Sequence, residues 1–337
     1  MKRVPKFAVL TLSAMLALSG CGMTSDPLPG TIGEDGQPAA VTTQDYAPAE
    51  VIKPKDGKKV KIGASFPLLD QFLQNVANSI KERAEAAGAE VSITSAEEKI
   101  EIQLNQIENF IASGVDALIV LPQDTATTAQ ITQKAKAANI PLVYVNRRPS
   151  ELPKGVPYVG SDSLVAGQLE MEQLAKLSNH QGNVAILQGD PTQEAAQQRT
   201  KGCEEVAAKY NMKVVFNQTG LWARDKGLAL AENLIQSGQQ VDVICANNDE
   251  MALGAINAFE NAGMLDKVVV GGVDATGDAL NAMAAGKLEV TVFQDAKGQG
   301  QAGVDTAIKM VNGDEVPDII NVPYQLVTPE NMSQFQQ

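Results

Sequence analysis

Polar side chains follow the ends of several short apolar runs in this sequence, and their types suit one kind of chemistry. Carboxylates accept hydrogen bonds, amides accept and donate them, and arginine presents a rigid fork of donors. Aromatic faces cover C–H groups and exclude water. Together these groups suit a neutral polyol, which has many hydroxyls and two flatter C–H faces. The candidate residues are Phe72, Asn146, Arg147, Trp222, Asn248, Asp274 and Gln294.

Several of these residues also have ordinary structural roles open to them. Trp222 could be half-buried packing, and Asp274 could be a turn residue after two glycines. Asn248 and Asp249 precede a helical pattern, and one of them is expected to cap that helix. We assign the cap to Asp249 and keep Asn248 for the ligand. On pattern alone, Arg199 could equally be a solvated helix residue.

Catalysis and metal binding find little support. The chain has one histidine, His180, which lies in a polar turn. It has no Walker A, H-E-x-x-H or G-x-S-x-G motif, and no nucleophile–base pair is evident. We therefore expect a protein that is not an enzyme and that holds no cofactor or metal. Cys203 and Cys245 could pair in an oxidising compartment, but their spacing does not fix their distance, and we favour buried free thiols.

Composition and charge exclude some partners. The chain has 337 residues, 44% of them apolar, and a formal net charge of −13. That length favours two domains. Because an acidic chain has no general attraction to nucleic acid or anionic lipid, we expect no nucleic-acid partner.

Residues 1–21 are typical of a targeting signal. A basic start precedes an apolar stretch, residues 7–18, that is shorter than the ~20 residues a membrane span needs. The stretch ends in Leu18-Ser19-Gly20-Cys21, which resembles the bacterial lipobox, and this implies cleavage before Cys21 and lipidation of Cys21. The alternative is an ordinary secretory signal. Residues 22–57 are rich in Gly, Pro, Thr, Ser and acids, and they predict a flexible tether.

From residue 59 onward, apolar runs alternate with helical stripes. Strands are predicted at 60–66, 90–94, 115–121 and up to 145, and then at 183–187, 213–217, 241–246, 268–274 and 289–294. This order predicts an α/β fold with parallel, doubly wound sheets. Residues 107–120 and 231–246 share a helix–glycine–strand pattern, which suggests two similar lobes, although such units are often alike. Ligands of open α/β sheets bind at the carboxyl ends of the strands, so two facing lobes predict a cleft that collects the polar residues.

With these residues the chain resembles the periplasmic sugar-binding proteins of ABC importers, the ribose and galactose/glucose group. The resemblance runs from about Val60 to Val327, and its most specific part is the motif at 247–255. It implies two lobes of the type I periplasmic binding protein, joined by a hinge. The implied lobes are 58–161 with 295–322, and 162–294 with 323–337. Further similar segments are 157–162, 188–191 with Arg199, and 271–275.

The resemblance also assigns roles to single residues. It implies that Phe72 and Trp222 stack on the sugar, and that Gln294 lies at a hinge crossing. Asp70 or Gln71 is implied as a further polar contact from the first loop. The remaining implied ligand-binding residues are Asn146, Arg147, Arg199, Asn248 and Asp274.

Departures from the family pattern leave the sugar unnamed. Asn146 and Trp222 are similar to the galactose type, whereas Gln294 is similar to the ribose type. Two sugar ligands of the galactose type are replaced by Gln193 and Ala195. The calcium loop of that type is missing, because residues 179–183 are too few and too poor in carboxylates.

The resemblance implies an extracytoplasmic, lipid-anchored solute-binding protein, expected to be a monomer. It would carry a monosaccharide or similar cyclic polyol to an ABC permease and its ATPase. One alternative is a sensory module that presents a sugar signal to a membrane receptor. Another is the effector domain of a LacI-like repressor, which the lipobox and the lack of an N-terminal helix-turn-helix argue against.

Overall fold

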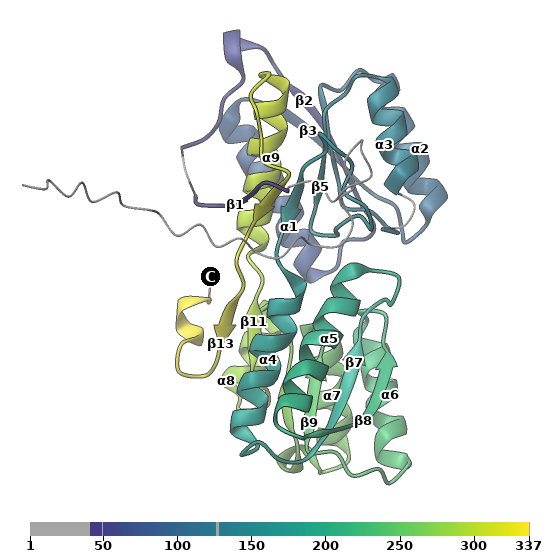
Figure 1. Ribbon diagram of the computed structural model, residues 1–337, viewed down its shortest axis with the longest axis vertical. Coiled ribbons are helices and arrows are strands. Elements are labelled where there is room, and N and C mark those ends of the chain that lie inside the picture. Colours follow the sequence, from purple (N-terminus) through teal and green to yellow (C-terminus); the bar gives the residue numbers. More distant parts are fainter. Residues whose placement is uncertain (1–40, 49, 126–127, 337) are drawn as a thin grey trace, which may run out of the picture.

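Two α/β lobes make up the molecule, one above the other in Figure 1. The computed structural model describes residues 41–48, 50–125 and 128–336. The signal at 1–21, with Cys21, lies outside these residues. Within the described ranges, no helix combines the length and the apolar character that crossing a bilayer requires.

The N-terminal lobe is a seven-stranded sheet in the order β1-β12-β6-β5-β4-β2-β3, with every neighbouring pair parallel. Helices α1 and α9 pack on one face, and α2 and α3 cover the other (Figure 1). The central strands β4 and β5 are buried throughout, as expected for strands covered on both faces. The strands are β1 (Thr43–Asp45), β2 (Lys61–Phe66), β3 (Glu90–Ser95), β4 (Ala117–Val120), β5 (Leu142–Val145), β6 (Tyr158–Gly160) and β12 (Ile319–Asn321). The helices are α1 (Gln71–Ala87), α2 (Ile100–Ala112), α3 (Thr128–Ala137) and α9 (Ala296–Val311).

The C-terminal lobe has a four-stranded parallel sheet in the order β10-β9-β7-β8. Helices α4 and α5 pack on one face, and α6, α7 and α8 on the other. The strands are β7 (Asn183–Gln188), β8 (Lys213–Thr219), β9 (Val243–Ala246), β10 (Val269–Gly271), β11 (Thr291–Phe293) and β13 (Gln325–Val327). The helices are α4 (Ser163–Leu177), α5 (Glu194–Lys209), α6 (Arg224–Gln236), α7 (Asp249–Asn261) and α8 (Gly277–Ala284). Short 3-10 turns cover Lys55–Gly57, Leu265–Lys267 and Met332–Gln334.

The fold is the expected one, two parallel α/β lobes, with one local difference. The strand predicted at 289–294 is β11, which pairs antiparallel with β13. It meets the edge of the parallel sheet only through single bridges, Gly271 to Val290 and Asp274 to Phe293.

Three chain segments cross between the lobes. They follow β6, β11 and β12 and lead into α4, α9 and β13 respectively. The crossings lie side by side at the waist of the molecule (Figure 1).

Residues 43–48 and 50–57 correct the predicted tether. β1 pairs in parallel with β12, and Tyr46, Val51 and Ile52 pack against the core of the N-terminal lobe. A segment of low hydrophobicity is held here because the edge of an existing sheet offers it hydrogen-bond partners. Residues 22–40 of the predicted tether lie outside the described part of the chain.

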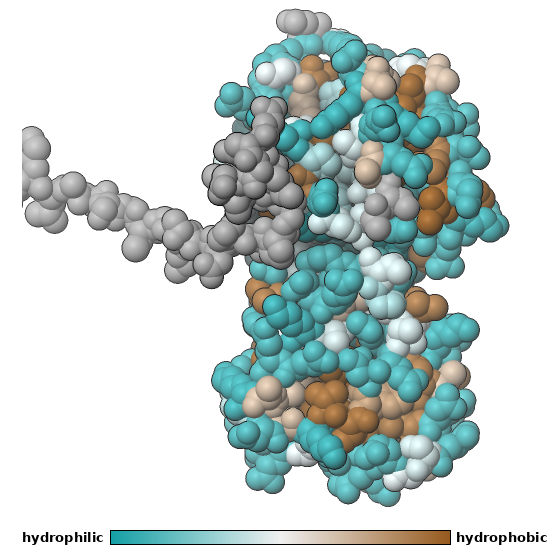
Figure 2. Space-filling model, turned by 45° about the vertical axis from the view of Figure 1, so that its right-hand side comes forward, coloured by the Kyte–Doolittle hydropathy of each residue, from teal (hydrophilic) through white to brown (hydrophobic). Residues whose placement is uncertain are grey.

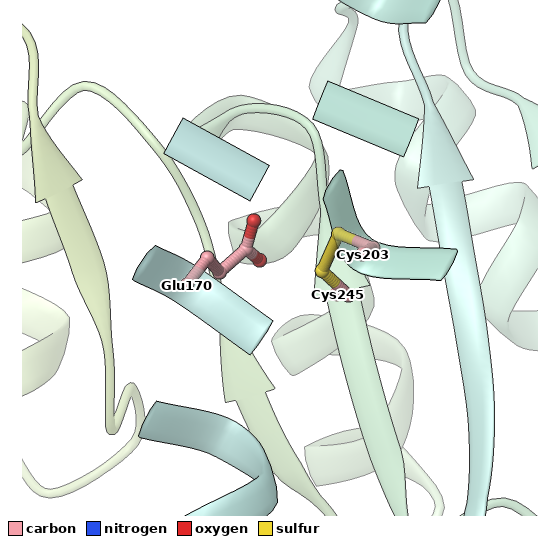
Figure 3. A group of neighbouring side chains, drawn as sticks. All are labelled: Glu170, Cys203 and Cys245. Carbon is pink, nitrogen blue, oxygen red and sulfur yellow. A yellow bond between two sulfur atoms is a disulfide. The ribbon is translucent and has the colours of Figure 1, made fainter. Parts of the chain in front are cut away.

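Cys203 and Cys245 correct a second expectation. They form a disulfide with a Cα–Cα distance of 6.7 Å, so the preference for free thiols was wrong. Cys203 lies on α5 and Cys245 on β9, directly beneath that helix (Figure 3). Packing of α5 on the sheet brings the two positions together, and spacing along the sequence carries no information about that contact.

Candidate ligand-binding site

A small cavity of about 50 Å³ lies between the lobes, and all nine predicted binding residues line it. The N-terminal lobe supplies Asp70, Phe72, Asn146 and Arg147. The C-terminal lobe supplies Arg199, Trp222, Asn248, Asp274 and Gln294. Four further residues, which were not predicted to contact a ligand, complete the wall: Leu73, Ser163, Gln193 and Ala195.

Parallel sheets explain why these distant residues meet. Asn146 follows β5, and Asn248, Asp274 and Gln294 come after β9, β10 and β11. The carboxyl ends of parallel strands converge on one edge, and the two edges face each other across the waist. Phe72 instead comes from the first turn of α1, which Asp70 caps by accepting a hydrogen bond from Leu73 N at 2.7 Å.

Three lining residues have backbones in the left-handed region. The φ values are 64° for Asn146, 68° for Trp222 and 126° for Asp274. Side chains with a Cβ rarely adopt such conformations, and in folded proteins they concentrate at functional sites. The surrounding packing therefore holds these three side chains in directions that an unconstrained chain would avoid.

Trp222 is held on three sides. Its indole Nε1 donates to Gln193 Oε1 at 3.1 Å, and its backbone carbonyl accepts from Asn248 Nδ2 at 3.1 Å. A Cβ added at Gly189 would lie 2.3 Å from the indole ring, so the ring packs directly on that glycine's backbone. Gln193 replaces a sugar ligand of the galactose type, as noted from the sequence. Here it orients the aromatic face of Trp222.

Asn248 caps α7, and this corrects the assignment made from the sequence. Its side chain accepts a hydrogen bond from Met251 N at 3.1 Å, while its amide nitrogen supports Trp222. Asp249 is fully buried and accepts from Thr276 N at 2.8 Å and Thr291 Oγ1 at 2.7 Å. Burial raises the pKa of Asp249 to about 7 despite these bonds.

Arg199 is buried behind the cavity with a nearly complete set of partners. Its Nη1 donates to Asn247 O at 2.6 Å, and its Nη2 donates to Gln294 Oε1 at 2.7 Å and to Tyr324 Oη at 2.8 Å. The guanidinium also lies 5.6 Å from the Trp222 ring and 5.7 Å from the Tyr324 ring. Burial opposes its charge, but Tyr324 and Asp274 outweigh burial, so the pKa of Arg199 stays above its usual value.

Asp274 is the acceptor left for a ligand. It is 8% exposed, and Arg199 Nη1 lies 3.9 Å from its Oδ1. Among the described residues, no hydrogen-bond donor satisfies its carboxylate. Burial raises the pKa of Asp274 well above its usual value, and Arg199 only partly offsets this.

The cavity wall holds equal numbers of acidic and basic side chains. Asp70 and Asp274 carry the acidic groups, and Arg147 and Arg199 carry the basic ones. Burial lowers the pKa of Arg147 to about 10, so it remains a cation at neutral pH. Two basic and two acidic side chains offer hydroxyl groups both donors and acceptors, which suits a neutral polyol.

Metal chemistry has no suitable donor set in the described ranges. The one group of potential ligands there is Glu170, Cys203 and Cys245 (Figure 3). Both sulfur atoms are bonded to each other, so neither is available as a thiolate. Glu170 accepts from Ala246 N at 2.9 Å, and burial raises its pKa well above the usual value.

A wider groove of about 660 Å³ adjoins the cavity. It shares Phe72, Asp274 and Gln294 with the cavity and runs between α1 and α8. Hydrophilic side chains predominate around the waist where the lobes meet (Figure 2). The groove provides an approach from solvent to the cavity wall.

Two α/β lobes that enclose a polar cavity between them define a two-lobed solute-binding protein. The chain belongs to the periplasmic binding protein family, whose domain matches residues 62–315. This membership makes it a binding protein that acts outside the cytoplasm, and not an enzyme.

Relatives and solved structures agree with this family. The "Putative rhizopine-binding protein" of Rhizobium meliloti is 42% identical over 82% of this chain and 92% of its own length. The ribose import binding protein RbsB of Bacillus subtilis is 30% identical over 86% of this chain and 94% of its own length. A solute-binding protein from Bacillus halodurans, solved with myo-inositol bound, is 42% identical. It superposes with a TM-score of 0.80 over 84% of this chain and 99% of that one.

Proposed function

We propose that this protein captures a monosaccharide or a similar cyclic polyol in the interlobe cavity and delivers it to an ABC permease. The observation that carries the proposal is the cavity itself. The N-terminal lobe contributes the aromatic side chain of Phe72 and the C-terminal lobe that of Trp222, and the rest of the wall is mostly polar. The relatives support the ligand class, because they are named for ribose and xylitol, and solved neighbours hold myo-inositol and D-allose.

Binding in this mechanism is coupled to closure. A ring held between Phe72 and Trp222 contacts both lobes, so it stabilises the closed arrangement by its difference in affinity for the two states. Asp274 and Arg147 would bond hydroxyls from opposite sides. Hydrogen bonds to charged groups contribute roughly 1.5–3 kcal/mol each, and a few suffice for micromolar affinity, about −8 kcal/mol. The closed form would then dock on the permease.

A thermal-shift screen followed by calorimetry tests the ligand class. The probes are myo-inositol, D-ribose, D-allose and xylitol, applied to a chain that begins at residue 41. We expect at least one probe to raise the melting temperature, with a one-to-one stoichiometry. A ligand at 100 times its Kd stabilises the folded state by about 2.7 kcal/mol. If none of these compounds, nor any other neutral sugar or cyclitol, shifts the melting temperature, the proposal is wrong.

We further propose that the protein is anchored through lipid on Cys21. The support is the order of basic, apolar and Leu-Ser-Gly-Cys segments in residues 1–21. Cells fed a radiolabelled fatty acid should label the wild-type protein and leave Cys21→Ser unlabelled. Equal labelling of both proteins would contradict lipidation of Cys21. Co-purification with a permease would distinguish a role in transport from a role in sensing.

A further inference from the structure

Each of the three crossings between the lobes is linked by hydrogen bonds to a side chain that lines the cavity, either directly or through one intervening side chain. The crossing after β6 contains Ser161, whose Oγ accepts from Gln299 Nε2 at 3.2 Å. Gln299 Oε1 in turn accepts from Asn146 Nδ2 at 3.0 Å. Gln299 is fully buried on α9 and does not line the cavity, so it joins Asn146 to the first crossing without touching a ligand.

The other two crossings converge on one guanidinium. Gln294 lies in the crossing after β11, and Tyr324 lies in the crossing between β12 and β13. Arg199 Nη2 donates to both, at 2.7 Å and 2.8 Å. Tyr324 is 9% exposed, lies outside the cavity wall and presents its ring to the guanidinium at 5.7 Å.

Burial makes these contacts directional. Arg199 is 4% exposed, so each of its donors needs a partner in the protein or in the ligand. A rotation about the hinge that moves Gln294 or Tyr324 therefore turns the guanidinium relative to Asp274 and Trp222. In the other lobe, movement of Ser161 turns Asn146 through Gln299. Connected polar groups of this kind respond as a unit, because each bond fixes the orientation of the next.

We propose that Tyr324 and Gln299 are positioning residues that couple the orientation of Arg199 and Asn146 to the angle of the hinge. Neither residue touches the ligand. Each sets the direction of a cavity side chain and thereby makes affinity depend on closure. This inference rests on the proposed polyol function for its affinity measurements, although one of its tests needs no ligand.

The affinity test uses Tyr324→Phe, which keeps the ring and removes the acceptor for Arg199. Tyr144→Phe is the matched control, since that buried tyrosine donates its hydroxyl hydrogen bond to Thr128 O at 2.8 Å inside the N-terminal lobe. With the probe that binds best among myo-inositol, D-ribose and D-allose, we expect Tyr324→Phe to weaken affinity five- to twenty-fold. The control should change affinity by less than twofold.

A double-mutant cycle separates positioning from general destabilisation. In an Arg199→Lys background no fork remains to be oriented, so adding Tyr324→Phe should change affinity by less than twofold. The proposal would be overturned if Tyr324→Phe weakened affinity five- to twenty-fold both in the wild-type and in the Arg199→Lys background. It would also be overturned if Tyr324→Phe left affinity unchanged in both backgrounds. Gln299→Met provides the same measurement from the other lobe, and it decides the question if Tyr324→Phe does not fold.

The ligand-free test uses the single tryptophan as a probe. Because Arg199 lies 5.6 Å from the Trp222 ring, release of the guanidinium should shift the emission maximum and raise acrylamide quenching in Tyr324→Phe. Tyr144→Phe should match the wild type. If the wild type binds no probe but this shift appears, the polyol function fails and the coupling stands. If the wild type binds and Tyr324→Phe has wild-type emission and affinity, the coupling fails alone.

Discussion

Asp274 and Arg199 show how burial sets the chemistry of single residues in the cavity. Arg199 donates from Nη1 and Nη2 to Asn247 O, Gln294 and Tyr324, and among the described residues its Nε has no partner, so it acts largely as a fixed support. Asp274 has only a 3.9 Å approach to Arg199, and its carboxylate remains open to the cavity. The carboxylate is therefore the side chain with most to gain from ligand hydroxyls.

Replacing Asp274 by asparagine should weaken polyol binding at least tenfold. Asparagine keeps the shape but loses an acceptor oxygen and the charge that strengthens hydrogen bonds, an effect of about 1.4 kcal/mol or more. Calorimetric titration measures the loss. Asp266→Asn, an exposed acidic residue in the turn Leu265–Lys267, is the control. A wild-type titration curve for Asp274→Asn would remove Asp274 from the site.

Close crossings of helices position the elements that bear these residues. A Cβ at Gly167 on α4 would lie 2.0 Å from Arg199 O, and one at Gly202 on α5 would lie 2.6 Å from Leu164 O. A second helix pair, α6 and α7, approaches through Gly227 and Gly254 in the same way. Backbone atoms cannot move aside as a flexible side chain can. Gly167 and Gly202 therefore set how near α5 lies to α4.

Gly167→Ala should destabilise the protein by about 1–3 kcal/mol and also displace Arg199. The added methyl group would clash with the backbone carbonyl of Arg199. The expected loss of stability is that of overpacking a filled interior. Urea unfolding gives the stability change. Gly277→Ala serves as the control, because a Cβ there meets nothing within 4 Å. Equal stability of the two variants would contradict this account.

The disulfide joins the same helix to the sheet. Cys203 lies one turn after Arg199 on α5, and Cys245 precedes Asn247, whose carbonyl accepts from Arg199. Closing a loop of 42 residues restricts the unfolded chain, with a stabilisation of about 2–4 kcal/mol. The bond therefore fixes the two elements that orient the guanidinium.

The double substitution Cys203→Ala with Cys245→Ala should lower the free energy of unfolding by about 2–4 kcal/mol. The measurement is urea unfolding of the variant beside the wild type with and without a reductant. The reduced wild type should resemble the variant. If the reductant leaves the free energy of unfolding of the wild type unchanged although free thiols are detected after unfolding, the disulfide contributes nothing to stability.

At the scale of the whole molecule, buried acids link stability to pH. Burial raises the pKa values of Glu170, Asp249 and Asp274 above those of the unfolded chain. A raised pKa contributes stability that is complete below the unfolded value, near 4, and is lost as pH rises through the folded value. Partly exposed acids such as Glu172 and Asp278 have lowered pKa values and act in the opposite sense above their unfolded values, but salt screens them.

The melting temperature should therefore decrease as the pH is raised from 5 to 8. The measurement uses about 0.5 M salt, which is enough to screen exposed ion pairs. Glu170→Gln should reduce this dependence, because glutamine keeps an acceptor for Ala246 N and has no proton to lose. Glu260→Gln, on the exposed end of α7, is the control. An identical pH slope for Glu170→Gln and the wild type would show that Glu170 does not titrate in this range.

Much of the cavity could be predicted because strand ends are visible in a sequence. Apolar runs locate β5, β9, β10 and β11, and in parallel sheets their carboxyl ends must meet, so Asn146 and Asp274 could be placed together. Arg199, which the pattern alone left open, came from the family resemblance instead. The choice of cap between Asn248 and Asp249 was wrong, because both types cap helices well and only the backbone direction decides which one does.

The sequence by itself determined the two-lobed α/β plan and the polar, aromatic content of the cavity, since both follow from local periodicity and residue type. Tertiary structure alone decided the Cys203–Cys245 bond, the pairing of β1 with β12, and the links from Gln299 and Tyr324 to the cavity. These contacts join residues far apart in the chain, and their partners are chosen by how helices and crossings pack. No local pattern records that geometry.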